Sequence, residues 1–130
     1  MTRDRRTFLA FAGAAAIAPF APVTAAQTTA APMYGLIGKM TAVSGQRDAL
    51  AAILIEGTGS MPGCISYVIA TDAADADALW ITEVWDSKAS HDASLRIPAV
   101  QAAIANGRPL IAGFSNSVET IPIGGYGLKR

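Results

Sequence analysis

The chain has 130 residues, with 10 basic and 10 acidic side chains, so its formal net charge at pH 7 is zero. A chain of this length holds one domain of ordinary size. Zero net charge argues against a nucleic-acid partner, because proteins that bind phosphate backbones concentrate lysine and arginine on one surface. With one cysteine and one histidine, the chain cannot form an internal disulfide or supply the ligands of a structural zinc site.

The first residues have the layout of an export signal. A basic start containing Arg5-Arg6 precedes the alanine-rich apolar run from Ala10 to Phe20, and small residues follow. This order predicts a signal peptide over residues 1–26. The alternative is an uncleaved membrane anchor, which needs about 20 strongly apolar residues. Alanine dominates the run here and Pro19 interrupts it.

The pair Arg5-Arg6, followed by Thr7-Phe8-Leu9, resembles the twin-arginine type of signal. Asp4 stands where that pattern usually has Ser or Thr. The resemblance implies that a folded protein is exported to the periplasm or secreted, with no stable membrane anchor after the signal is removed. A linker, residues 27–32, then leads into the domain.

The rest of the chain alternates between strand and helix patterns. Residues 33–43, with β-branched and aromatic side chains, predict a first strand. Ser44 is the expected N-cap of a first helix, whose apolar residues recur at helical spacing from Leu50 to Met61. Residues 64–71 and 78–85 predict a second and a third strand.

The polar connector, residues 72–77, is short enough to join those two strands as an antiparallel hairpin. Ser87 opens a further helix, residues 97–111 predict another, and residues 113–121 predict the last strand. The order β-α-β-β-α-β predicts an α+β fold of the ferredoxin-like, split βαβ type, with helices on one face of an antiparallel sheet. The domain covers residues 33–121, and residues 122–130 form a C-terminal tail.

Both faces of this sheet are expected to be apolar. In the third strand Leu79, Ile81 and Trp85 alternate with Trp80 and Val84. Helices on one face leave the other without a cover, which favours a homodimer that packs two sheets together. The alternative is that the C-terminal tail folds over the free face.

The mature chain resembles a known family in two motifs. These are the turn Met61-Pro-Gly-Cys-Ile-Ser-Tyr67 and the strand end Glu83-Val-Trp85, which is followed by a helix containing His91 and Ser94. Together with the Gly-Leu-Ile-Gly-Lys start, they resemble the antibiotic biosynthesis monooxygenase family. The resemblance implies a dimeric α/β barrel and cofactor-independent oxygenation of quinols or other aromatic phenols, with O₂ as the second substrate.

The chain departs from the family pattern at one position. Many members have a histidine where this chain has Ser94, and its single histidine, His91, lies one helical turn earlier. Haem-degrading relatives share an asparagine on the first strand, a tryptophan near the position of Ser94 and a histidine near that of Ile104. None of the three is present, so no haem or other cofactor is expected.

Two residues are candidate proton acceptors. His91 is suited to accept a proton from a phenol, because imidazole exchanges protons near neutral pH. The alternative is a surface histidine without a chemical role. Glu83 shares a strand face with apolar neighbours, which would desolvate its carboxylate and make it a second candidate base. The alternative is a glutamate at the sheet edge paired with Arg or Lys.

Trp85, Tyr67 and Ser94 are candidate pocket residues. Trp85 and Tyr67 would form the flat wall of an aromatic site, or would simply be core. Ser94 shares a helix face with His91. No metal site is expected, because the aspartates of residues 72–77 lack the glycine and distant glutamate of a calcium loop.

Two functions follow as hypotheses. The first is an exported, cofactor-independent monooxygenase acting on a quinol or other phenolic small molecule, with His91 and Glu83 as bases. The alternative is a non-catalytic dimeric module of the same fold that binds a small molecule or supports a stress response. Fold alone does not decide between them.

Overall fold

The computed structural model of the protein describes residues 31–128. The elements along these residues are β1 (Tyr34–Ala42), α2 (Arg47–Gly57), β2 (Cys64–Thr71), β3 (Ala78–Trp85), α3 (Lys88–Ser94), α4 (Pro98–Gly107), the 3₁₀ turn η2 (Arg108–Leu110) and β4 (Ile111–Thr120). The predicted signal peptide, residues 1–26, and most of the linker, residues 27–32, lie outside the described residues. Within the described range, no helix is long and apolar enough to cross a membrane.

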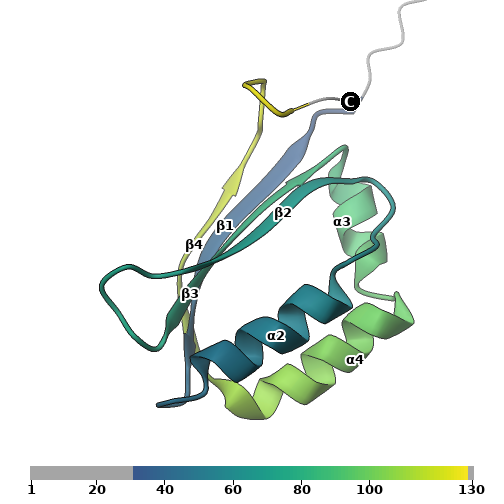
Figure 1. The fold of residues 1–130 in the computed structure, drawn as a ribbon. Coiled ribbons are helices and arrows are strands. Elements are labelled where there is room, and N and C mark those ends of the chain that lie inside the picture. Colours follow the sequence, from purple (N-terminus) through teal and green to yellow (C-terminus); the bar gives the residue numbers. More distant parts are fainter. Residues whose placement is uncertain (1–30, 129–130) are drawn as a thin grey trace, which may run out of the picture. The chain divides into compact units, whose positions relative to one another are not determined.

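The strands form one antiparallel sheet in the order β2-β3-β1-β4. Helix α2 connects β1 to β2, and α3 and α4 together connect β3 to β4. Figure 1 shows the helices on one side of the sheet, with α2 and α4 side by side and α3 at the other end of the strands. This arrangement confirms the predicted α+β ferredoxin-like fold, and its second crossover contains the two helices that the sequence predicts there.

The β2–β3 hairpin is held by the first aspartate of its connector. The Asp72 carboxylate accepts hydrogen bonds from the backbone N–H groups of Ala74, at 2.8 Å, and Asp75, at 2.9 Å, and from Nε1 of Trp80, at 2.7 Å. These hydrogen bonds lower the pKa of Asp72 to about 2, and the largest effect comes from the Ala74 N–H, followed by Trp80 and the Asp75 N–H. The aspartates of this connector therefore stabilise a turn, and the described residues contain no cluster able to hold a metal ion.

Strand register divides the sheet residues between two faces as the alternation predicts. Across β1 and β3, Tyr34 pairs with Trp85 and Leu36 pairs with Glu83. These residues face the helices, and Glu83 and Trp85 are buried there. Trp80 lies on the opposite face, because it is an odd number of residues from both Glu83 and Trp85 on β3 and successive side chains of a strand alternate between faces.

The core lies between the sheet and helix α2. Its buried residues are Ala42, Leu50, Leu54, Leu79 and Ile81. Helices α2 and α4 approach closely because Gly57 has no side chain. A Cβ at this position would collide with Ala103, so only glycine fits at this crossing. This close packing joins α4 to α2, and residues of both helices line the cavity described below.

Several boundaries differ from the sequence predictions, and the first helix ends at Gly57 rather than continuing to Met61. Helix α2 begins after Gln46, which makes no side-chain capping bond, so Ser44 is not the cap. The helix predicted over residues 97–111 ends at Gly107, where a Cβ would lie 3.1 Å from Leu50 and η2 turns the chain back. Strand β4 therefore begins at Ile111 rather than at residue 113. The Ser87 cap is confirmed, since its side chain accepts a bond from the Ser90 N–H.

The face of the sheet opposite the helices carries apolar side chains from all four strands. Register places Ile37, Val68, Val84 and Val118 on this face. Val68 is 51% exposed and Val118 is 53% exposed. The expectation that the second face is also apolar is therefore met, and its cover, whether a second copy or the tail, remains a prediction.

Candidate functional site

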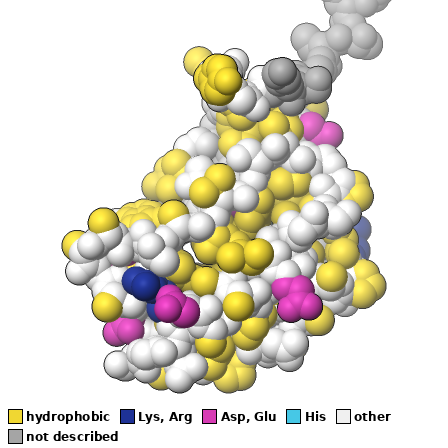
Figure 2. Space-filling view, in the orientation of Figure 1, with side chains coloured by type: hydrophobic (Ala, Val, Ile, Leu, Met, Phe, Trp, Pro, Cys, Tyr) yellow, Lys and Arg dark blue, Asp and Glu magenta, His cyan; other side chains and the backbone are white. Residues whose placement is uncertain are grey.

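A cavity of about 570 Å³ lies between the helix-facing side of the sheet and the helices. Apolar side chains from α2, α4 and β4 make most of its wall. Its polar and aromatic lining residues are Thr58, Tyr67, Glu83, Trp85, His91, Ser94, Arg108 and Phe114. Figure 2 shows hydrophobic side chains gathered across the middle of the face that Figure 1 presents, between the strands and the helices.

Strand β3 contributes a carboxylate and an indole to this wall. Glu83 and Trp85 are two positions apart on one strand, so their side chains share a face. The indole Nε1–H of Trp85 donates a hydrogen bond to Oε1 of Glu83 at 2.9 Å. Trp85 is fully buried and Glu83 is 9% exposed, so the indole holds the carboxylate in a fixed position beside the cavity.

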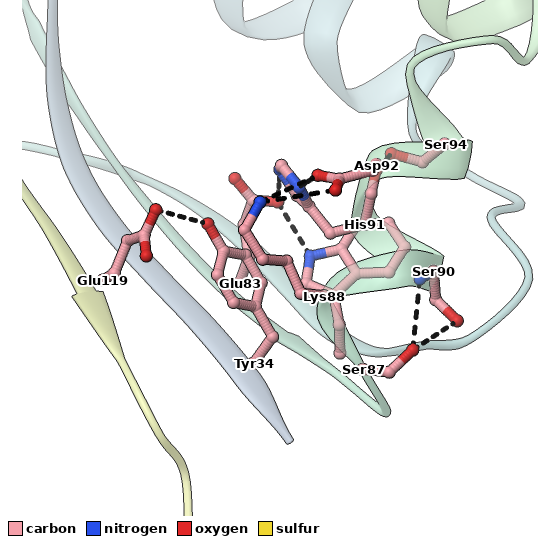
Figure 3. A network of polar contacts seen from close by, with 10 residues as sticks. Tyr34, Glu83, Ser87, Lys88, Ser90, His91, Asp92, Ser94 and Glu119 are labelled. Atoms are coloured by element: carbon pink, nitrogen blue, oxygen red, sulfur yellow. Dashed lines mark hydrogen bonds and ion pairs between the residues drawn. The ribbon is translucent and has the colours of Figure 1, made fainter. Parts of the chain in front are cut away.

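Helix α3 places His91 against the same pair. Its Nε2 lies 3.9 Å from Oε1 of Glu83. The imidazole meets Trp85 edge-on, with ring centroids 5.5 Å apart, and is tilted against Tyr34 at 5.0 Å. These two rings confine the histidine, and Figure 3 shows it standing between the helix and the strands.

Asp92 orients the imidazole from the other side. Its Oδ1 lies 3.1 Å from Nδ1 of His91. An ionised carboxylate only accepts hydrogen bonds, so Nδ1 carries the proton in this contact. The contact with His91 and the ion pair with Lys88 lower the pKa of Asp92. Nε2 of a neutral His91 is then left without a proton, and it lies 3.9 Å from Oε1 of Glu83, which is within ion-pair distance when the imidazole is protonated but longer than a hydrogen bond.

Burial raises the pKa of Glu83 above its usual value. The Trp85 hydrogen bond and the charge of a protonated His91 act in the opposite direction, and burial outweighs both. The alternative of a sheet-edge glutamate paired with Arg or Lys is wrong, because β3 is a central strand and, among the described residues, the ion-pair partner of Glu83 is His91. A carboxylate with a raised pKa is a stronger base than one in water.

Tyr67 and Ser94 complete the predicted set. Tyr67 lies opposite Glu83 on β2 and lines the cavity. Burial, and next the neighbouring Glu83, raise the pKa of its phenol, so it stays protonated. Ser94 also lines the cavity and is buried, but its hydroxyl donates to the His91 backbone carbonyl at 2.6 Å. The structure thus brings all five predicted residues to one cavity.

Two residues of the site are absent from the sequence prediction. Asp92 follows His91 directly, and neighbours in a helix do not normally face each other, so spacing gave no signal. Tyr34, whose hydroxyl donates to Glu119 at 3.2 Å, is aligned with Trp85 only by strand pairing. The alternation of side chains along β1 and β3, considered together, would have suggested that Tyr34 and Trp85 share a face.

The fold and the site define a class of protein. A four-stranded antiparallel sheet with helices on one face, and an apolar cavity between the two layers, is a ferredoxin-like α+β domain with room for a small organic molecule. The side chains at its wall include two groups able to accept a proton, a carboxylate and an imidazole, beside aromatic rings.

Comparison with known proteins identifies the family. Residues 33–106 match the antibiotic biosynthesis monooxygenase family. The chain therefore belongs to this family, as the sequence motifs indicate. A search of curated protein sequences finds no significant match to the chain.

Solved structures agree with this assignment. A candidate antibiotic biosynthesis monooxygenase from Chloroflexus aurantiacus J-10-fl is 66% identical, with a TM-score of 0.73, over 75% of this chain and 99% of that one. A similarly described protein from Caulobacter crescentus CB15 is 14% identical, with a TM-score of 0.65, over 72% and 92%. One from Nitrosomonas europaea is also 14% identical, with a TM-score of 0.63, over 79% and 100%. The last two show the shared fold alone.

Proposed function

We propose that this chain is an exported, cofactor-independent monooxygenase that acts on a quinol or another phenolic small molecule. The observation that carries the proposal is the contact between Nε2 of His91 and Oε1 of Glu83, 3.9 Å apart at the wall of an apolar cavity of about 570 Å³. Two groups able to accept a proton, side by side at an aromatic wall, are suited to deprotonate a phenolic hydroxyl.

The reaction begins with that proton transfer. The quinol O–H gives its proton to His91 or Glu83, and the resulting anion is electron-rich enough to pass an electron to O₂. One oxygen atom then enters the ring and the other leaves as water, so quinol and O₂ give hydroxyquinone and water. The substrate supplies all the electrons, and no separate reductant is needed.

The protein contributes position and a dry environment. Trp85 and Tyr67 hold the aromatic ring beside the pair, and the apolar wall withholds water from the anion. Orientation and exclusion of water each lower the barrier without any cofactor chemistry. Ser94 retains free lone pairs after donating to the His91 carbonyl, so it can accept a bond from a second substrate hydroxyl.

The test is oxygen uptake by the purified mature protein with reduced menadione and related quinols. We expect uptake above the spontaneous rate, at least about tenfold lower in His91→Ala and in Glu83→Gln, in line with the usual contribution of a general base. Arg96→Ala is the control, since Arg96 is exposed just beyond α3 and lies outside the cavity lining.

Each outcome has a distinct meaning. Uptake that is equal in His91→Ala and the parent removes His91 from the mechanism. No uptake with any of several aromatic substrates favours the non-catalytic binding module instead. Incorporation of one ¹⁸O atom from ¹⁸O₂ into the product distinguishes oxygenation from simple oxidation of the quinol.

Assembly as a homodimer is part of the same proposal. The apolar residues on the face opposite the helices support it, because exposed apolar area of this kind is usually covered by a partner. A second sheet packed there gives the dimeric barrel that the family resemblance implies. Size-exclusion chromatography with light scattering tests this, and a clean monomer at micromolar concentration would overturn it.

Export through the twin-arginine route also belongs to the proposal. It rests on Arg5-Arg6 and the apolar run that follows. Fractionation of cells that express the full chain, compared with an Arg5→Lys, Arg6→Lys variant, tests it. Retention of the variant alone in the cytoplasm is the expected result, and equal export of both contradicts the route.

A further inference from the structure

A second, smaller cavity opens beside the candidate site. Its volume is about 230 Å³, and it shares Met40, Tyr67, Glu83 and Phe114 with the larger one. We call it the side lobe. A cavity of about 150 Å³ is enough to hold a benzene molecule, so the side lobe has room for one additional ring next to the proton-accepting pair.

Gly38 creates the floor of this lobe. It lies on the helix-facing side of β1, opposite Ile81, where neighbouring positions carry Leu36 and Met40. A Cβ built on Gly38 meets no atom within 4 Å, and the backbone there is not left-handed. The space that a side chain at position 38 would fill is therefore empty, and the backbone conformation there does not require a glycine.

An irregularity in the adjacent strand lies at the same level. The β1–β4 register shifts between Ile37, which pairs with Val118, and Lys39, which pairs with Ser115. Two β4 residues thus stand opposite Gly38, and one of them, Asn116, has a φ of 51°. This is a β-bulge, a feature that re-aims side chains next to binding sites, and the flanking residues Ser115 and Ser117 line the side lobe.

The side lobe suits an uncharged group. Leu36, Met40, Ile81 and Phe114 supply apolar walls. Lys39 is the cation among the lining residues, but its Nζ is engaged by Asp72 at 3.8 Å and by Asp75 at 3.7 Å. With that charge neutralised and Glu83 nearby, an anionic extension finds no partner here.

We propose that Gly38 determines ligand length in this site, and that the ligand is a phenol extended by an apolar group of about one ring, seated in the side lobe. The inference rests on the proposed function for the placement of the phenolic hydroxyl beside His91 and Glu83. Its test uses binding rather than turnover, so the two can fail separately.

The experiment compares two probes that share one phenolic head. These are 4-methylphenol and 4-phenylphenol, titrated calorimetrically into the mature protein and into Gly38→Val. The parent binds 4-phenylphenol at least about tenfold more tightly, as expected for burial of one additional ring. Gly38→Val, whose methyl groups occupy the lobe, loses that advantage while its affinity for 4-methylphenol stays within about twofold.

Two further variants keep the result interpretable. Gly38→Ala adds one methyl group and gives an intermediate loss, and it replaces the valine variant if circular dichroism shows that the latter does not fold. Gly124→Ala is the matched control, because a Cβ there also meets no atom within 4 Å and the residue lines neither cavity. It should bind both probes as the parent does.

The inference is overturned if the parent binds both probes equally or binds neither, or if folded Gly38 variants keep the full preference for 4-phenylphenol. It stands, and the proposed function fails, if the preference depends on Gly38 while no quinol supports oxygen uptake. If uptake is observed but the preference is absent, the proposed function stands and the assignment of Gly38 does not.

Discussion

Replacement of Glu83 by glutamine separates the role of its charge from the role of its shape. Glutamine keeps an oxygen that can accept the Trp85 Nε1–H bond, now 2.9 Å long, and removes the buried negative charge. We expect Glu83→Gln to fold more stably than the parent at pH 8 and to lose oxygenation. A residue that costs stability where it stands is one retained for another reason.

The magnitude follows from the surroundings of the carboxylate. Glu83 is 9% exposed, one hydrogen bond from Trp85 reaches it, and His91 at 3.9 Å helps only when protonated. Burial outweighs both, because the pKa of Glu83 is raised. The ionised Glu83 carboxylate therefore lowers the free energy of unfolding by on the order of 1 kcal/mol relative to a neutral amide. This difference corresponds to about 4–8 °C in Tm for a domain of this size.

The direction in which the stability difference changes with pH follows from the raised pKa of Glu83. A carboxyl whose pKa is raised on folding binds its proton more tightly in the folded state, so the folded state gains stability as the pH falls through that pKa. The stability advantage of Glu83→Gln should therefore be full at pH 8 and vanish as the pH falls through a folded-state pKa above the usual 4.5. Urea unfolding at pH 8 and at pH 4 measures both values.

The control is Glu56→Gln on α2, where the glutamate is exposed and substitution should leave stability unchanged at both pH values. If Glu83→Gln is less stable than the parent at pH 8, or if its difference from the parent does not vary with pH, the carboxylate is a net stabilising group and the reasoning is refuted.

Three further variants test other parts of the structure. Asp92→Asn, which weakens the hold on Nδ1 of His91, should lower kcat of quinol oxygenation several-fold, shift its pH profile and leave KM unchanged; a change confined to KM contradicts a positioning role. Asp72→Asn should destabilise the fold at pH 7, and since the pKa of Asp72 is about 2, unfolding curves should converge as the pH falls from about 4 toward 2. Leu50→Ala, at a fully buried position, should cost about 2–5 kcal/mol in chemical denaturation, while Ile55→Ala, at a position 60% exposed on the same helix, should cost less than about 0.5 kcal/mol.

The sheet could be predicted because a strand imposes a period of two on every residue it contains. Once residues 78–85 are assigned to a strand, Glu83 and Trp85 must share a face with Leu79 and Ile81, and the apolar character of those two marks that face as buried. The pairing of a carboxylate with an indole beside a cavity follows from one local assignment. It needs no knowledge of distant contacts.

Helix ends were less predictable because tertiary packing decides them. Ser44 is a favourable cap by residue type, yet the chain first turns through Gly45, with a φ of 79°, and the helix starts after Gln46. The last helix stops at Gly107, where a side chain would crowd Leu50 and where Pro109, two residues on, disfavours further α-helix.

The side lobe lies at the point where the period of two fails. On β4 the alternation predicts which side chains share a face only up to Ser115, since the residue inserted at the bulge transfers the following ones to the other face. Asn116 tolerates the left-handed backbone better than most residues, but this marks the position only after the register with β1 is known. If the site binds a phenol as we propose, proton transfer is set by residues in regular strand and helix, and the length of ligand by one glycine opposite an irregularity. Changes at Gly38 should therefore alter which phenol binds without altering the pair that deprotonates it.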